Sequence, residues 1–93
     1  MAECRAVIDA ADDEIMAALN RRLEAHRRLH DHKTANGYPL FDAGREQAIL
    51  DRLNAHNEGP LDAGDVGRLV SAILAISGQA VHRLRGTTPS AMP

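Results

Sequence analysis

This chain of 93 residues has almost no aromatic side chains: Tyr38 and Phe41 are the only two, and there is no tryptophan. The core must therefore be built from Ala, Val, Leu and Ile, which suits closely packed helices. The single cysteine, Cys4, excludes an internal disulfide and a cysteine-based metal site, and it favours a reducing compartment. No apolar run reaches the roughly 20 residues needed to span a bilayer. We therefore expect a cytoplasmic protein that does not contact membranes.

An excess of charge of one sign is also missing, because 11 Lys and Arg residues face 13 Asp and Glu residues, for a net charge of -2. Nucleic-acid binding depends on a surplus of basic groups, so we expect no nucleic-acid partner. Ten of the 11 basic residues are arginine. Arginine is suited to bidentate binding of carboxylates, although a genome that prefers arginine codons accounts for the same bias.

The alternation of apolar and polar residues that is typical of strands is absent, and Gly and Pro cluster at only three places. The pattern predicts an all-α chain with helices over residues 4–35, 42–57 and 62–86. The first helix should end at Asn36-Gly37, a typical left-handed terminator. We expect residues 1–86 to form one helical domain and residues 87–93 to form a disordered tail.

The predicted first helix is much longer than its partners. At 1.5 Å per residue it spans about 45 to 50 Å, whereas the second spans roughly 22 Å. Ile8, Ile15 and Leu29 fall on one side of the first helix, so its apolar stripe runs over most of its length. Two shorter helices cannot cover this stripe, which favours an intertwined homodimer. The alternative is a monomeric three-helix bundle with a broken first helix.

Three basic residues lie where apolar residues are expected. Arg22 interrupts the apolar side of the first helix, and Lys33 lies on the same side three turns later. Arg45 shares the apolar face of the second helix with Ile49. Cations that face a helical core are costly unless an anion is present, so they indicate a site for an anionic small molecule. Alternatively, each side chain reaches the surface or pairs with an internal carboxylate such as Glu46.

Other kinds of site find little support. His26 and His30 have the i, i+4 spacing of metal ligands, but no third ligand is suitably spaced, so we expect no metal. We interpret the polar run as a solvated helix face; it consists of His26, Arg27, Arg28, His30, Asp31 and His32. Catalytic Ser-His-Asp or Cys-His arrangements, phosphate-binding glycine loops and CxxC pairs are absent. We also expect no cofactor.

From Arg5 to about Leu84 the sequence resembles the all-helical chorismate mutases. The segments that carry the resemblance, in order, are Arg5, Ile8-Asp9-Ala10, Asp12-Asp13-Glu14-Ile15, Leu19-Asn20-Arg21-Arg22, Lys33, Asn36-Gly37-Tyr38-Pro39 and Asp42-Ala43-Gly44-Arg45-Glu46. The last segment resembles the family's Asp-x-x-Arg-Glu signature. The family forms dimers of three-helix chains that share a long first helix, which agrees with the argument from helix lengths.

The resemblance implies a pericyclic conversion of chorismate to prephenate without a metal or cofactor. Arg22 and Arg5 of the partner subunit would hold the carboxylates of this dicarboxylate substrate, with Arg45 at the same end. Lys33 would donate to the ether oxygen and to a carboxylate. Glu46 would hold the ring hydroxyl.

Other positions are implied by the same resemblance. The backbone near Asp42 would also contact the ring hydroxyl, and Ser77 would lie beside a carboxylate. Val81 departs from the family, which usually has Gln or Glu four residues after this serine as a second donor to the ether oxygen. Losing such a donor lowers the rate by about 10²- to 10³-fold. If this is the only defect, Val81→Gln should raise kcat about tenfold or more.

Val81 leaves other functions open. There are three alternatives: the activity on chorismate is weak, a neighbour in the third helix supplies the missing donor, or the substrate is not chorismate. An aminodeoxychorismate mutase and an isochorismate-pyruvate lyase are related enzymes with similar pockets, although Asp42 and Glu46 favour a 4-hydroxylated substrate. The alternative of another class is a non-catalytic helical dimer that acts as a binding module.

Overall fold

The computed structural model describes residues 1–37 and 43–85 of the chain, and these form three α-helices: α1 (Ala2–Ala35), α2 (Ala43–His56) and α3 (Ala63–Arg85). Within these ranges there is no strand, so the predicted all-α fold with a long first helix is confirmed. The helix ends lie within two residues of the predicted positions. Asp42 and the predicted tail at residues 87–93 lie outside the described residues.

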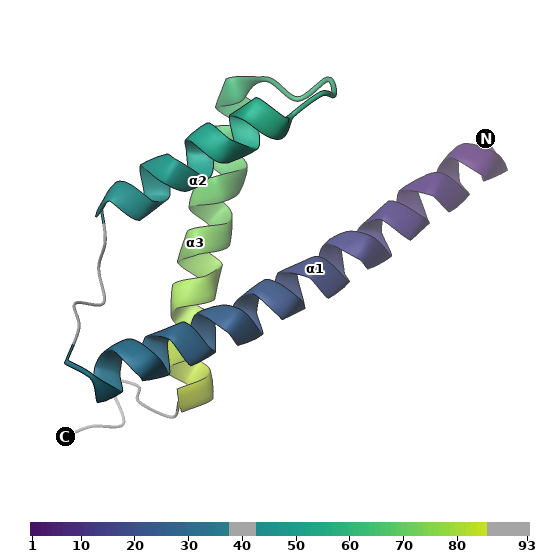
Figure 1. Ribbon diagram of the computed structural model, residues 1–93. Coiled ribbons are helices and arrows are strands. Elements are labelled where there is room, and N and C mark those ends of the chain that lie inside the picture. The colour runs from purple at the N-terminus through teal and green to yellow at the C-terminus, as the bar shows by residue number, and fades with distance from the viewer. Residues whose placement is uncertain (38–42, 86–93) are drawn as a thin grey trace.

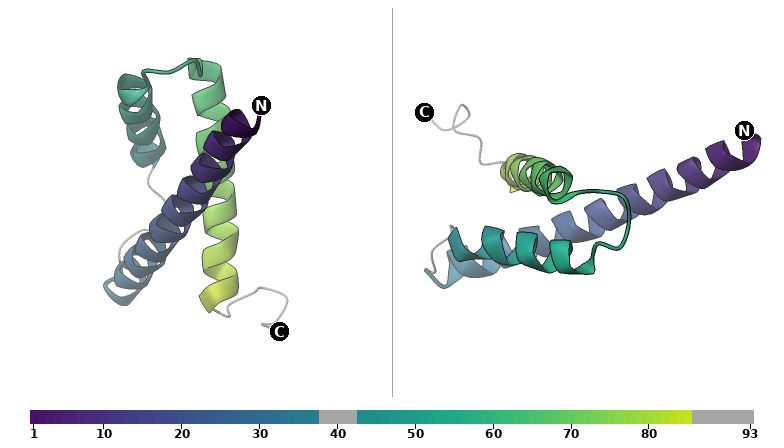
Figure 2. Two further views of the ribbon diagram at one scale, coloured as in Figure 1. Left: turned by 90° about the vertical axis from the view of Figure 1, so that its right-hand side faces the viewer. Right: turned by 90° about the horizontal axis from the view of Figure 1, so that it is seen from above.

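Helix α3 packs against both of the other helices, whereas α1 and α2 make no close backbone contact with each other. The chain reverses between α2 and α3, and α3 crosses the C-terminal half of α1 (Figure 1). The N-terminal half of α1 projects beyond the other two helices (Figure 2). The radius of gyration is 16.3 Å, compared with about 12 Å for a compact domain of this length. The single chain is therefore extended.

The largest cluster of buried residues lies between α2 and α3. Ile49, Val66 and Val70 form its centre, and three partly buried leucines surround them: Leu50, Leu53 and Leu74. Further along α3, Ser77, Ala80 and Val81 are buried as well. Helix α1 contains no buried residue. The buried core of the single chain therefore consists of residues from α2 and α3.

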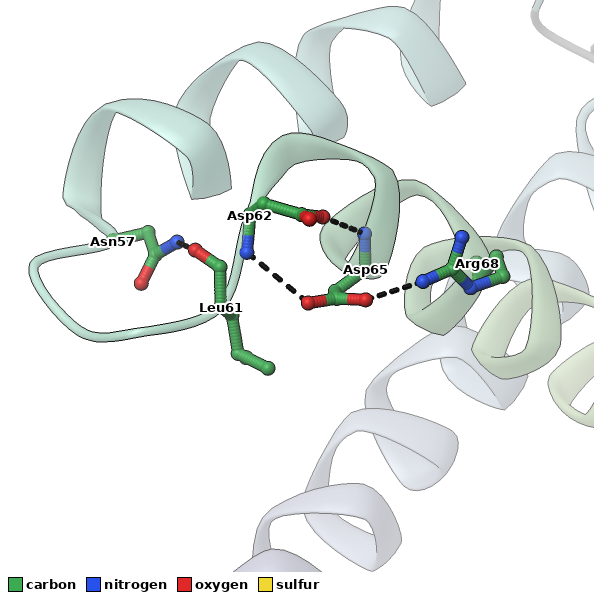
Figure 3. A network of polar contacts seen from close by, with 5 residues as sticks. All are labelled: Asn57, Leu61, Asp62, Asp65 and Arg68. Atoms are coloured by element: carbon green, nitrogen blue, oxygen red, sulfur yellow. Dashed lines mark hydrogen bonds and ion pairs between the residues drawn. The ribbon is translucent and has the colours of Figure 1, made fainter.

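The start of α3 is fixed by reciprocal capping (Figure 3). The Asp65 backbone N–H donates to Asp62 Oδ1 over 2.7 Å, and the Asp62 backbone N–H donates to Asp65 Oδ2 over 3.1 Å. This exchange satisfies two backbone donors at the helix start and places negative charge there. Arg68 pairs with Asp65, and the Asn57 amide donates to the Leu61 carbonyl over 2.6 Å. The connection between α2 and α3 is therefore defined by local polar contacts.

Helix α1 ends where the sequence predicts. Gly37 has a φ of 71°, in the left-handed region that favours glycine, and its N–H donates to the Thr34 carbonyl over 3.3 Å. The Asn36 backbone N–H and side-chain amide both donate to the His32 carbonyl, at 3.1 and 2.8 Å. These bonds satisfy carbonyls of the last turn and stop the helix.

Candidate active site

A cavity of about 530 Å³ lies where the three helices meet. Its size is within the usual range of small-molecule sites. All three helices contribute to its walls, through Arg22, Ala25, His26, Leu29, Lys33, Arg45, Glu46, Ile49, Leu74 and Ala75.

The spacing of the lining residues explains how the helices build this cavity. Four α1 residues, Arg22, His26, Leu29 and Lys33, are separated by four, three and four positions, which places them on one side of a helix. On α2, Arg45 and Ile49 are separated by one turn. The structure thus brings together the three cations that interrupt the apolar pattern.

The three cavity cations, Arg22, Lys33 and Arg45, have no carboxylate partner among the described residues. The ion pairs Arg27–Glu24, Arg28–Glu24 and Arg68–Asp65 each lie within a single helix and involve none of the three. Glu46 also lines the cavity, but no ion pair joins it to a cation. Among the described residues, these cations are therefore not neutralised by internal carboxylates.

Arg22 is hydrogen-bonded to a buried α3 residue although it lies among other positive charges. Burial lowers the pKa of its guanidinium, and the positive charges of Arg45 and Arg52 lower it further. Its Nη1 donates to the Oγ of Ser77, a buried α3 residue, over 3.1 Å. Ser77 thus accepts a hydrogen bond that helps to orient the guanidinium, and the concentration of positive charge creates an electrostatic preference for an anion.

Sequence reasoning missed two cavity residues. His26 lines the main cavity, so the prediction that it belongs to a solvated polar face is wrong. Arg52 lines a second cavity of about 260 Å³, which shares Arg22, Arg45 and Ile49 with the first. The signal was available, since His26 follows Arg22 by four residues and Arg52 follows Arg45 by seven, which are spacings of one helix face.

The remaining predicted residues lie elsewhere. Arg5 is exposed on α1, and its 17-residue separation from Arg22 corresponds to about 26 Å along the helix axis. Val81 is only 1% exposed and does not line the main cavity. A longer side chain at this position would have to displace packed neighbours before it reached the cavity. Asp42 lies outside the described residues.

The described residues contain no group of three or more His, Cys, Asp or Glu side chains that could hold a metal ion. In the same ranges, no helix is both long enough and apolar enough to cross a membrane.

The fold and the cavity define the class of protein: a three-helix chain with a cation-lined site suited to a small organic anion. The family described as chorismate mutase type II matches residues 4–80, and the chain belongs to this family. Membership implies a small-molecule substrate and chorismate mutase activity. No curated protein and no solved structure shows a significant match to the chain.

Proposed function

We propose that this protein is a chorismate mutase that converts chorismate to prephenate. The observation that carries the proposal is that Arg22, Lys33 and Arg45 line one cavity without a carboxylate partner among the described residues. With Glu46 included, these side chains have a formal charge of about +2, which complements a dicarboxylate. Membership in the chorismate mutase type II family supports the choice of substrate.

The rearrangement breaks a carbon–oxygen bond and forms a carbon–carbon bond within one molecule, so it requires no nucleophile, general base or metal. The protein accelerates it by holding the flexible dicarboxylate in its compact reactive conformer. Fixed positive groups also stabilise the negative charge that develops on the ether oxygen. The Ser77 hydrogen bond to Arg22 supports this mechanism because it orients a cation before the ligand arrives.

The roles of individual residues follow from the family resemblance and from their positions in the cavity. Arg22 and Arg45 bind carboxylate, and Lys33 donates to the ether oxygen and to a carboxylate. Glu46 accepts a hydrogen bond from the ring hydroxyl. In this arrangement Ser77 acts mainly through Arg22, its hydrogen-bond partner.

We also propose that the helical domain of residues 1–86 functions as an intertwined homodimer. The apolar side chains in the N-terminal half of α1 are largely exposed in the single chain, including Val7, Ile8, Ile15 and Met16 at 54 to 69%. A second copy would cover these side chains. Such a pairing also accounts for Arg5, which is too far along the helix to reach the cavity of its own chain. Arg5 of the partner subunit would complete the site.

The test is direct measurement of chorismate consumption with identification of prephenate. Arg22→Ala and Lys33→Ala should each lower kcat/KM by about 10²-fold or more, because each removes a positioned donor. Arg28→Ala is the matched control, since its side chain is 78% exposed, pairs with Glu24 and does not line the cavity. Circular dichroism should show that all three variants stay folded.

Other results would redirect the proposal. Turnover of isochorismate or aminodeoxychorismate in place of chorismate would identify one of the related enzymes. No turnover of any of the three substrates would favour a non-catalytic module. If Arg22→Ala or Lys33→Ala unfolds the chain, these cations serve the structure and do not form a substrate site.

A further inference from the structure

His26 is the one titratable residue of the main cavity to which neither the proposed mechanism nor the family resemblance assigns a role. It lies one turn after Arg22 and seven residues before Lys33, and all three line the same wall. The ring is partly buried, and its Nδ1 is fully buried without a hydrogen-bond partner among the described residues. A buried Nδ1 is not accessible to a ligand, so a ligand in the cavity would contact the ring through Nε2.

The charged groups near this ring come from α1, and α2 adds two more charges to the walls of the same cavity. Helix α1 places Arg22, His30 and Lys33 around it. Helix α2 adds Arg45 and Glu46, and the α3 residues of the cavity wall, Leu74 and Ala75, are uncharged. Cations therefore outnumber carboxylates around His26 when the cavity contains no anion.

This environment disfavours the protonated form of the ring in the free protein. Burial lowers the pKa of His26, and the positive charges of Arg22, His30 and Lys33 lower it further. A dicarboxylate in the cavity would offset two of these positive charges. The imidazole would then bind a proton more readily, and as an imidazolium it would donate a charge-assisted hydrogen bond to the ligand.

We propose that His26 is a further substrate-binding residue, which contacts the bound dicarboxylate between Arg22 and Lys33 and takes up a proton as the ligand enters. The inference rests on the proposed function for the identity of the ligand. It adds a specific consequence, because binding of a dianion becomes linked to pH through a histidine of the cavity wall. The carboxylates of the ligand stay ionised over the range in which histidine titrates, so they do not themselves produce the linkage.

The first experiment uses the unmutated protein and therefore does not depend on a variant that folds. The ring carbon resonances of the histidines are followed by NMR between about pH 5 and pH 8, with and without saturating prephenate. The pKa of His26 should rise when prephenate binds. His56 is the internal control, since it is exposed at the end of α2 and bonds to the Arg52 carbonyl outside the cavity. Its ring resonances should not change when prephenate binds.

The second experiment compares steady-state kinetics of His26→Gln with those of His56→Gln. Glutamine keeps a donor of similar size but cannot carry the proton. At about pH 6 the KM of His26→Gln for chorismate should be about three- to tenfold above that of the unmutated protein, and the difference should shrink towards pH 8. His56→Gln should match the unmutated protein throughout. The change should appear in KM more than in kcat, because the carboxylates are charged in the ground state as well.

The outcomes separate this inference from the function on which it rests. Turnover of chorismate by the unmutated protein, together with a His26 pKa that does not move on prephenate binding, overturns the role of His26 and leaves the function intact. If the KM of His26→Gln has the same pH dependence as the KM of the unmutated protein, the role of His26 is likewise overturned and the function is left intact. Absence of chorismate turnover overturns the proposed function. A His26 pKa that still rises with prephenate would then support the dicarboxylate contact alone.

Discussion

The two halves of α1 have a similar apolar pattern but very different surroundings. Every residue from 1 to 18 is exposed. The second half carries all the partly buried residues of the helix: Leu19, Arg22, Leu23, His26, Arg27, His30 and Lys33. The difference arises because α3 crosses only the second half (Figure 1). Helical periodicity therefore indicates which face of a helix is to be covered, but the lengths of the neighbouring elements determine whether the same chain can cover it.

The contrast also separates two kinds of residue that look alike in the sequence. Arg5 and Arg22 are both arginines on the long helix, yet only Arg22 lines a cavity built by its own chain. If the N-terminal half serves a second copy, these two arginines meet only across the dimer. The difference between the two halves of α1 can be tested by measuring enzyme activity, dimer association, the free energy of unfolding and the pH dependence of stability.

The largest effect is expected from mixing two inactive variants. Arg5→Ala and Arg22→Ala should each lower kcat/KM by about 10²-fold or more. When the two are unfolded and refolded together in equal amounts, half the dimers should be mixed, and one site in each mixed dimer should contain both arginines. About a quarter of the unmutated activity should return. Activity that stays at the level of the separate variants would show that the two arginines do not share a site.

Association should depend on the exposed half of α1. Ile15→Asp places a charge on the apolar side in both copies, so the dimer should lose about 3 kcal/mol or more and dissociate at micromolar concentration. Asn20→Asp is the control, because it adds the same charge at an exposed position about 140° around the helix. Sedimentation velocity measures both. A compact monomer for the unmutated protein would contradict the homodimer.

Val81→Gln tests whether packing or catalysis dominates at the position where the sequence departs from its family. Because Val81 is 1% exposed, the buried amide should lower the free energy of unfolding by about 1 to 3 kcal/mol. Gln79→Ala, at an exposed position of the same helix, should change it by less than about 0.5 kcal/mol. Chemical denaturation gives these values. A tenfold rise in kcat for Val81→Gln would show instead that the new side chain reaches the substrate.

The smallest effect concerns stability and pH. The pKa of His26 in the folded protein is below its ordinary value of about 6.5, so the unfolded chain binds a proton more strongly. The stability that depends on the neutral ring is fully present above about pH 6.5 and is lost as the pH falls towards the folded-state pKa. The denaturation midpoint should fall on acidification in the unmutated protein, and this fall should be smaller in His26→Gln. Bound prephenate should also make the fall of the denaturation midpoint on acidification smaller.

The fold was predictable because its signals are local. Helix ends at Gly37 and Asp62 depend on turn and capping chemistry within a few residues, and the structure has both. The cavity cations were predictable because a charge among apolar residues stands out. His26 did not stand out, since it begins a run of polar residues. The hydrogen bond from Arg22 to Ser77 joins residues 55 positions apart and depends on how two helices cross, which no local pattern contains.

The long uncovered helix also has a consequence for the order of events during synthesis. Helix α1 is made first, but α3, which contacts it, is made last. At about 5 to 20 residues per second, residues 36–85 emerge over roughly 2 to 10 s after α1 is complete. During that time α1 has no tertiary partner from its own chain, whereas α2 and α3 can pair as soon as their capped connection forms. Of the three helices, α1 therefore remains longest without a tertiary contact to its own chain.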